Sequence, residues 1–127
     1  MSAVKKQTLR GLNILCIDNY IDSLEVLRLT LQLEGAEVFT AVSSDQALFL
    51  LKKSPVDVVV SDLIMPDENG IEVLQKLRSA GFRGPAIALT GVRDDIVQLG
   101  ALTQGFTAYL VKPVEPERLI KTIEGTI

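Results

Sequence analysis

Five polar side chains stand at the ends of four apolar runs of the sequence: Asp18, Asn19, Asp62, Thr90 and Lys112. They offer carboxylates, an amide, a hydroxyl and an ammonium group. A hard divalent cation such as Mg²⁺ prefers oxygen ligands from carboxylates, carbonyls and water. A carboxylate beside such a cation, a lysine and a hydroxyl is well placed to attack phosphorus, since aspartyl-phosphate formation is a known kind of covalent catalysis. These residue types therefore indicate phosphoryl transfer, provided that the fold brings them together.

The apolar runs have the composition of buried strands, and the stretches between them repeat apolar residues at helical spacing. Asp22 with Glu25, and Ser43 with Gln46, resemble the capping signals at the start of helices. Gly35 is placed to end the first helix. Strands are predicted over residues 12–17, 37–42, 56–60, 86–89 and 108–111. Helices are predicted over residues 22–34, 43–54, 71–80, 94–103 and from residue 116 onward.

This alternation predicts an α/β fold with right-handed crossovers and a parallel sheet that is covered on both faces. The doubly wound solution for a (βα)5 chain is the flavodoxin-like sheet of five strands in the order 2-1-3-4-5. The length of 127 residues suits one domain. We expect residues 1–10 to form an N-terminal tail and residues 11–127 to form the domain.

In a parallel sheet the carboxyl ends of the strands share one edge, and ligands bind there, where the strand order reverses. Asp62 is the best candidate for the nucleophile because it ends the central strand. Thr90 and Lys112 are then candidates to hold the phosphoryl oxygens. The ordinary interpretation is that loops after strands are polar because they are solvated, so that Thr90 is a simple strand-end hydroxyl and Lys112 a solvated charge. The convergence of several suitable residues at one edge favours the functional interpretation.

Composition excludes several classes of function. The 13 basic and 16 acidic residues give a net charge of −3, so the chain lacks the excess of positive charge that direct binding of nucleic acid requires. The sequence has no histidine, and Cys16 is its single cysteine, so the usual ligands of a zinc site are missing. No apolar stretch approaches the roughly 20 residues that span a bilayer, and no signal-peptide pattern is present. We expect a soluble cytoplasmic protein with a buried thiol at Cys16.

Four segments of the sequence carry a family resemblance: ILCIDN, VVVSDLIMPDENGIEVL, AIALTG and AYLVKPV. SDLIMPDENG followed by LVKP at this distance is the most specific part. In order and spacing these segments resemble the receiver domain of two-component response regulators, over roughly residues 11–124. The resemblance implies a signalling domain that is not an enzyme.

The resemblance also implies the chemistry of the site. Asp62 would accept a phosphoryl group from a phosphohistidine on a sensor histidine kinase or a histidine phosphotransfer protein. Mg²⁺ (or Mn²⁺) would bind near Asp18, Asn19 and Asp62, with the backbone carbonyl of Ile64 as a further ligand.

Three further residues match the family's pattern, and two of them, Thr90 and Tyr109, match its switch. Thr90 and Lys112 would contact the phosphoryl group, and Tyr109 matches the aromatic residue that turns inward as the threonine moves. The Lys112-Pro113 bond is often cis in this family. Tyr109 also has a simpler interpretation, as a half-buried residue of the sheet.

The sequence departs from the family at Asn19, where an acid usually stands and ligates the metal. Asn19 keeps a carbonyl oxygen but lacks the charge. Our hypothesis is that Mg²⁺ binds more weakly than at a site with three acids, but still binds, because Asp62, Thr90 and Lys112 are all present.

The region 94–103 is unusually apolar for an exposed helix, with Ile96, Val97, Leu99 and Leu102 on more than one face. We expect extra burial in the core, with a homodimer or a partner through the fourth helix, fifth strand and fifth helix as the alternative. No output module follows residue 124, so the chain is expected to be either a stand-alone receiver or a piece of a hybrid kinase or larger regulator.

Three other functions remain open at this point. The first is a degenerate receiver, an interaction module that never takes phosphate. The second is a phosphatase with an aspartate nucleophile, although Ile64 stands where such enzymes usually carry a second acid. The third is a flavodoxin-like cofactor binder, although no phosphate-binding loop follows the first strand.

Overall fold

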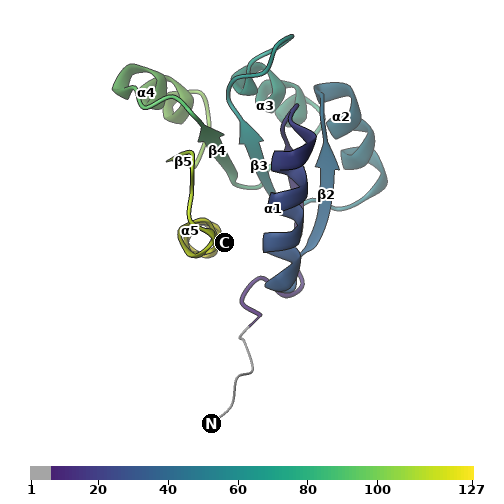
Figure 1. Cartoon of the computed structure of the whole chain (residues 1–127). Helices are drawn as coiled ribbons and strands as arrows, with labels where there is room; N and C mark the ends of the chain where they lie inside the picture. Colours follow the sequence, from purple (N-terminus) through teal and green to yellow (C-terminus); the bar gives the residue numbers. More distant parts are fainter. Residues whose placement is uncertain (1–6) are drawn as a thin grey trace.

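The computed structural model describes residues 7–127, and within them five strands alternate with five helices (Figure 1). Residues 1–6, which are most of the predicted tail, lie outside the described residues. The elements in chain order are β1 (Asn13–Ile17), α1 (Ile21–Leu33), β2 (Glu37–Ala41), α2 (Ser44–Lys53), β3 (Val58–Asp62), α3 (Gly70–Ser79), β4 (Ala86–Thr90), α4 (Asp95–Thr103), β5 (Ala108–Val111) and α5 (Pro116–Thr126).

All neighbouring strands pair in parallel, in the order β2-β1-β3-β4-β5. The predicted flavodoxin-like sheet is therefore confirmed. The register aligns the carboxyl ends of the central strands, with Asp62 opposite Leu89 and Thr90 opposite Val111. The side chains that follow these strands consequently emerge along one edge of the sheet.

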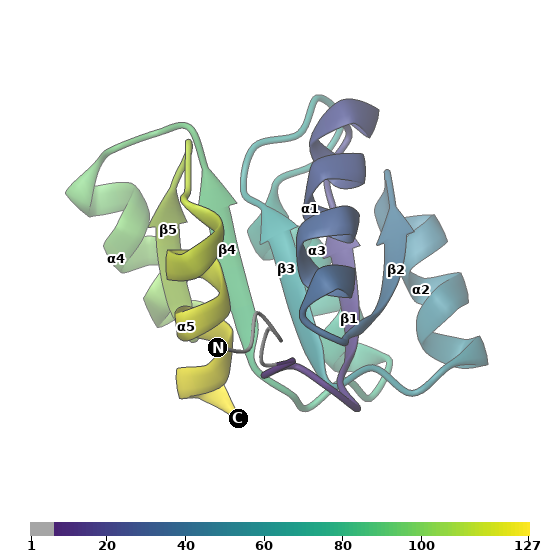
Figure 2. The ribbon, with the colours of Figure 1, turned by 60° about the horizontal axis from the view of Figure 1, so that its bottom comes forward.

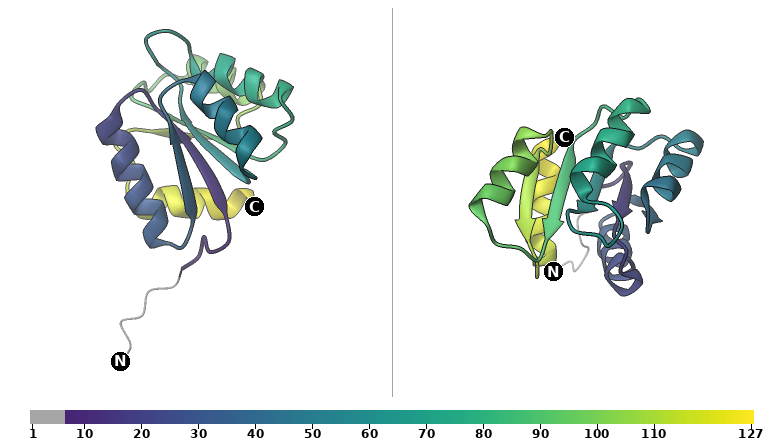
Figure 3. Two further views of the ribbon diagram at one scale, coloured as in Figure 1. Left: turned by 90° about the vertical axis from the view of Figure 1, so that its right-hand side faces the viewer. Right: turned by 90° about the horizontal axis from the view of Figure 1, so that it is seen from above.

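The helices form a layer on each face of the sheet. Figure 2 shows α1 and α5 in front of the sheet with α2, α3 and α4 behind it, and Figure 3 shows the same layers from the side and from above. Successive strand residues point to opposite faces: Val59 packs among residues of α2, α3 and α4, whereas Val58 and Val60 pack under α1 and α5. This two-sided burial explains why β3 is an unbroken apolar run.

The N-terminal side of the chain adds to the core before β1 begins. Leu9 is fully buried in the cluster under α1 and α5. Its backbone N–H donates to the carbonyl of Glu34 at 3.0 Å. Full burial of one leucine side chain contributes about 1.5–3 kcal/mol to stability.

Helix starts agree with the sequence at α2 but not at α1. The hydroxyl of Ser43 caps α2 by accepting from the backbone N–H of Gln46. The predicted cap at Asp22 is wrong, because α1 already begins at Ile21, one residue earlier, without a side-chain cap. The physical reason is that Asp18 accepts from the backbone N–H of Tyr20 at 2.9 Å and turns the chain into the helix sooner.

The apolar surplus of α4 is not buried. Ile96 is 82% exposed and Leu99 is 67% exposed, while Val97 packs against the core and Ala101 is buried. The expected extra burial is therefore wrong for Ile96 and Leu99. A short helix lying over one layer can bury only one of its faces, here the face that carries Val97 and Ala101.

None of the helices found between residues 7 and 127 is both long and apolar enough to cross a bilayer.

Cys16 provides a chemical test of the packing. Its thiol is fully buried in β1, and desolvation raises its pKa to about 12. We expect Ellman's reagent to label native protein at least about a hundredfold more slowly than guanidinium-unfolded protein at about pH 8, since a free thiol titrates near 8.5. Because the folded pKa lies above the unfolded value, the stability contributed by the neutral thiol is complete below about pH 8.5 and is lost as the pH rises toward 12. Rapid labelling of the native protein would contradict this packing.

Candidate functional site

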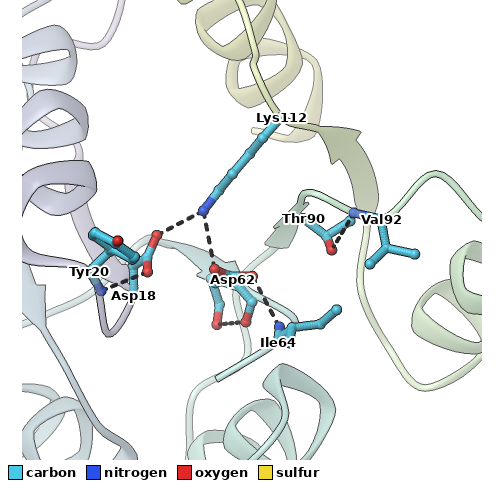
Figure 4. Close-up of polar contacts among 8 residues, drawn as sticks. Asp18, Tyr20, Asp62, Ile64, Thr90, Val92 and Lys112 are labelled. Atoms are coloured by element: carbon cyan, nitrogen blue, oxygen red, sulfur yellow. Dashed lines mark hydrogen bonds and ion pairs between the residues drawn. The ribbon is translucent and has the colours of Figure 1, made fainter. Parts of the chain in front are cut away.

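The predicted site residues come from the carboxyl ends of four strands. Asp18 follows β1, Asp62 ends β3, Thr90 ends β4 and Lys112 follows β5. Figure 4 shows the side chain of Lys112 reaching between Asp18 and Asp62, with Thr90 on the neighbouring strand. The sheet topology alone explains this convergence, because parallel strands present their carboxyl ends at the same edge.

Lys112 joins the two acids. Its Nζ lies 2.9 Å from Oδ2 of Asp18 and 3.1 Å from Oδ2 of Asp62. The side chains of Asp18 and Asp62 are only 2% and 12% exposed, so these ion pairs are poorly screened by water. Burial lowers the pKa of Lys112, but the hydrogen bonds and charges of the two carboxylates outweigh it and leave the pKa above its usual value. Lys112 is therefore a fixed positive charge at neutral pH.

The other oxygen of each acid is held by the backbone. Oδ1 of Asp18 accepts from the N–H of Tyr20 at 2.9 Å, and Oδ1 of Asp62 accepts from the N–H of Ile64 at 3.0 Å. Both carboxylates are thus oriented at two points. The positioning by Tyr20 and Ile64 could not be found from the sequence, because every residue except proline has a backbone N–H.

Thr90 and Tyr109 are linked through one residue. The hydroxyl of Thr90 is buried and accepts from the N–H of Val92 at 3.2 Å, and the hydroxyl of Tyr109 donates to the carbonyl of Val92 at 2.6 Å. In the described part of the chain, the hydroxyl of Thr90 makes no hydrogen bond to Asp62 or Lys112, although the backbone carbonyl of Thr90 accepts from the backbone N–H of Lys112 at 2.7 Å. The two predicted switch residues therefore share a partner, which no sequence pattern indicates. The Lys112-Pro113 bond is cis, as expected.

The oxygen donors around Asp18 and Asp62 fit a divalent cation. One oxygen of Asp18 and one of Asp62 reach the same nitrogen atom of Lys112, so the two carboxylates are close enough to face one cation. Asn19 follows Asp18 and is exposed. Within residues 7–127 there is no cluster of three or more acidic, histidine or cysteine residues that could hold a metal. Hard oxygen donors of this kind fit Mg²⁺, with fewer charges than a site built from three acids.

Comparison with known proteins settles the family. The response regulator receiver domain matches residues 14–124 of this chain. The chain belongs to the response regulator receiver domain family. Receivers are signalling modules of two-component systems, not classical enzymes, and they imply a histidine kinase as partner. Members of the family are typically Mg²⁺-dependent.

Relatives of this receiver include small and large proteins. An uncharacterized 14.6 kDa protein of Leptolyngbya boryana is 38% identical over 120 residues, which cover 93% of this chain and 92% of that protein. The regulatory protein VanR of Enterococcus faecium is 29% identical over 114 residues, which cover 90% of this chain but 49% of VanR. The receiver thus spans about half the length of VanR.

Solved receivers share its fold. The chemotaxis protein CheY4 of Vibrio cholerae superposes with a TM-score of 0.84 at 31% identity, covering 91% of this chain and 98% of CheY4. A two-component response regulator from Clostridium difficile gives a TM-score of 0.85 at 25% identity, covering 91% and 95% of the two chains.

Proposed function

We propose that this receiver accepts a phosphoryl group on Asp62 from a phosphohistidine of a sensor histidine kinase or a histidine phosphotransfer protein. The observation that carries the proposal is the contact of the Lys112 ammonium group with both Asp62 and Asp18. An oxygen of Asp62 would form the new bond to phosphorus while the bond from phosphorus to the donor's ring nitrogen breaks and that nitrogen takes a proton from solvent. The chain has no histidine, so the donor must be another molecule or another part of a longer protein.

Mg²⁺ (or Mn²⁺) would be held by Asp18, Asn19, Asp62 and the carbonyl of Ile64. When bound, it supplies positive charge to the phosphoryl oxygens. Lys112 neutralises the same developing charge, and it remains protonated because its pKa is raised. The N–H of Ile64 keeps the Asp62 carboxylate oriented for attack.

The shared bonds to Val92 suggest how the switch works. If the Thr90 side chain rotates so that its hydroxyl donates to a phosphoryl oxygen, Oγ1 moves away from the N–H of Val92 and that hydrogen bond is lost. The segment at Val92 is then free to move, and the hydroxyl of Tyr109 loses a fixed partner. The proposed output is a changed surface of α4, β5 and α5, on which Ile96 and Leu99 offer exposed apolar area for a homodimer or a downstream protein.

Intact mass spectrometry tests the phosphoacceptor function. Treatment with acetyl phosphate and Mg²⁺ should add one phosphoryl group to the wild type, and a chelator or Asp62→Ala should prevent the addition. A degenerate receiver, which binds partners without phosphorylation, is the second candidate, because Asn19 replaces one acid of the site. An unmodified wild type would reject the phosphoacceptor function and leave this second candidate.

We propose that residues 11–127 form the receiver domain and that residues 1–10 form a tail, of which Leu9 packs into the core of the domain. We place its action in the cytoplasm, with a kinase or phosphotransfer protein as partner and no direct contact with nucleic acid.

Asn19→Asp should strengthen Mg²⁺ binding. Two unit charges about 4 Å apart interact by roughly 4 kcal/mol at an effective dielectric constant of 20, and repulsion from the neighbouring carboxylates offsets most of this gain. We expect affinity to rise by about tenfold, a net gain of about 1.4 kcal/mol, measured by isothermal titration. Gln32→Glu, which adds the same charge at the far end of α1, is the control and should leave the affinity unchanged. Equal affinities of wild type and Asn19→Asp would reject the hypothesis.

A further inference from the structure

The loop between β3 and α3, residues 63–69, supports the backbone that contacts Asp62. The loop closes on itself at its base, where the N–H of Gly70 donates to the carbonyl of Leu63 at 2.8 Å and Ile64 pairs with Asn69 in an antiparallel bridge. The N–H of Ile64 then donates to Asp62. Any shift of the Asn69 side of the loop is therefore passed to Ile64.

Glu68, one residue before Asn69, ties this loop to two helices. Its Oε1 accepts from the backbone N–H of Ser44 at 2.9 Å, and its Oε2 accepts from Nζ of Lys76 at 2.9 Å. Nζ of Lys76 also donates to the hydroxyl of Ser44 at 3.2 Å. Loop, α2 and α3 thus meet at one carboxylate, and this group of Glu68, Ser44 and Lys76 is called the loop clamp.

The two interactions of the Glu68 carboxylate, with Lys76 and with Ser44, differ in strength. Lys76 is 51% exposed, so its ion pair is well screened and weak. Ser44 is buried and opens α2, where a backbone N–H has no partner within the helix and a negative charge is favoured. Burial raises the pKa of Glu68, but the hydrogen bonds from Lys76 and Ser44 outweigh it and lower the pKa, so the carboxylate is charged at neutral pH.

We propose that Glu68 is a positioning residue for the phosphorylation site: its carboxylate holds the β3–α3 loop on α2 and thereby fixes the backbone of Ile64 against Asp62. This inference rests on the proposed function, in which the carbonyl of Ile64 ligates the metal. Glu68 touches neither Asp62 nor the proposed ligands, and it acts only through the loop.

The experiment compares Glu68→Ala with Asp67→Ala, an exposed acid one residue away whose loss changes the net charge equally. Hydrogen exchange of the Ile64 amide is measured without metal, and Mg²⁺ affinity is measured by isothermal titration. In Glu68→Ala we expect the Ile64 amide to exchange roughly tenfold faster, as for loss of one hydrogen bond to a charged group. We expect Mg²⁺ affinity to fall by roughly tenfold, as for loss of a group that orients metal ligands. Asp67→Ala should match the wild type in both.

Milder variants keep the test decisive if Glu68→Ala folds poorly. Glu68→Gln keeps an oxygen that accepts from Ser44 and should recover most of the affinity, whereas Lys76→Met should have a small effect. If Glu68→Ala exchanges the Ile64 amide at the wild-type rate, the inference is overturned. It is also overturned if stability falls while Mg²⁺ affinity stays at the wild-type value. If the wild type binds no Mg²⁺, the proposed function is rejected instead. In that case the exchange rate of the Ile64 amide alone shows whether Glu68 holds the loop.

Discussion

Lys112→Met should take up phosphoryl groups from acetyl phosphate about 10²–10³-fold more slowly than the wild type, the usual cost of removing one group that stabilises transition-state charge. Methionine keeps much of the apolar stem but removes the cation that contacts Asp18 and Asp62. The initial rate of phosphorylation, followed by intact mass at saturating Mg²⁺, measures the effect.

The same variant should also be less stable than the wild type. Without Lys112, the largely buried carboxylates of Asp18 and Asp62 have no positively charged partner. We expect this loss to lower the free energy of unfolding by about 2 kcal/mol near neutral pH. Mg²⁺ should therefore raise the melting temperature of Lys112→Met more than that of the wild type.

Lys121→Met is the matched control, because Lys121 lies on α5, is 72% exposed and pairs with Glu117, which is 77% exposed. It should be phosphorylated at the wild-type rate and keep the wild-type stability. A Lys112→Met protein that behaves like Lys121→Met would show that the ammonium group has no part in the chemistry.

Gly70→Ala should destabilise the fold by about 2–3 kcal/mol, at the upper end of the range for overpacking. A Cβ at this position would lie 2.3 Å from the carbonyl oxygen of Asp62 and 2.9 Å from Cα of Leu63. Both neighbours are backbone, so the end of β3 or the start of α3 must move. Alanine is favoured over glycine in helices by about 1 kcal/mol, which is too little to offset the clash. Because the displaced atoms carry Asp62, phosphoryl uptake should fall as well.

Urea denaturation measures this stability change, and Gly91→Ala serves as its control. Nothing lies within 4 Å of a Cβ built at Gly91, and its φ is not positive. Gly91→Ala should therefore be neutral or stabilise the protein by about 0.4–1 kcal/mol through the unfolded state. A Gly70→Ala midpoint equal to that of Gly91→Ala would mean that the close approach of α3 to β3 is not required.

Local patterns in the chain were sufficient to predict the architecture. The apolar runs, their helical and strand periods and the cap at Ser43 depend on near neighbours, so they can be read without coordinates. The rule that crossovers are right-handed then limits the sheet to few topologies. The errors arose where tertiary contacts override local signals. At Asp22, the bond from Tyr20 to Asp18 starts α1 early, and at Ile96 the packing of α4 leaves an apolar side chain in water.

By itself the sequence determined the alternation of strands and helices and the edge at which Asp18, Asp62 and Lys112 would meet, because parallel strands joined by right-handed crossovers present their carboxyl ends at one edge. The strand order followed from the known doubly wound arrangement of such a chain. Only the tertiary structure decided which atoms touch. The ion pair between Asp18 and Lys112 joins residues 94 positions apart. The bonds to Val92 and the bond from Ser44 to Glu68 use backbone groups that every residue except proline offers. Such contacts leave no trace in composition or spacing, since they depend on the distances that packing sets between distant parts of the chain.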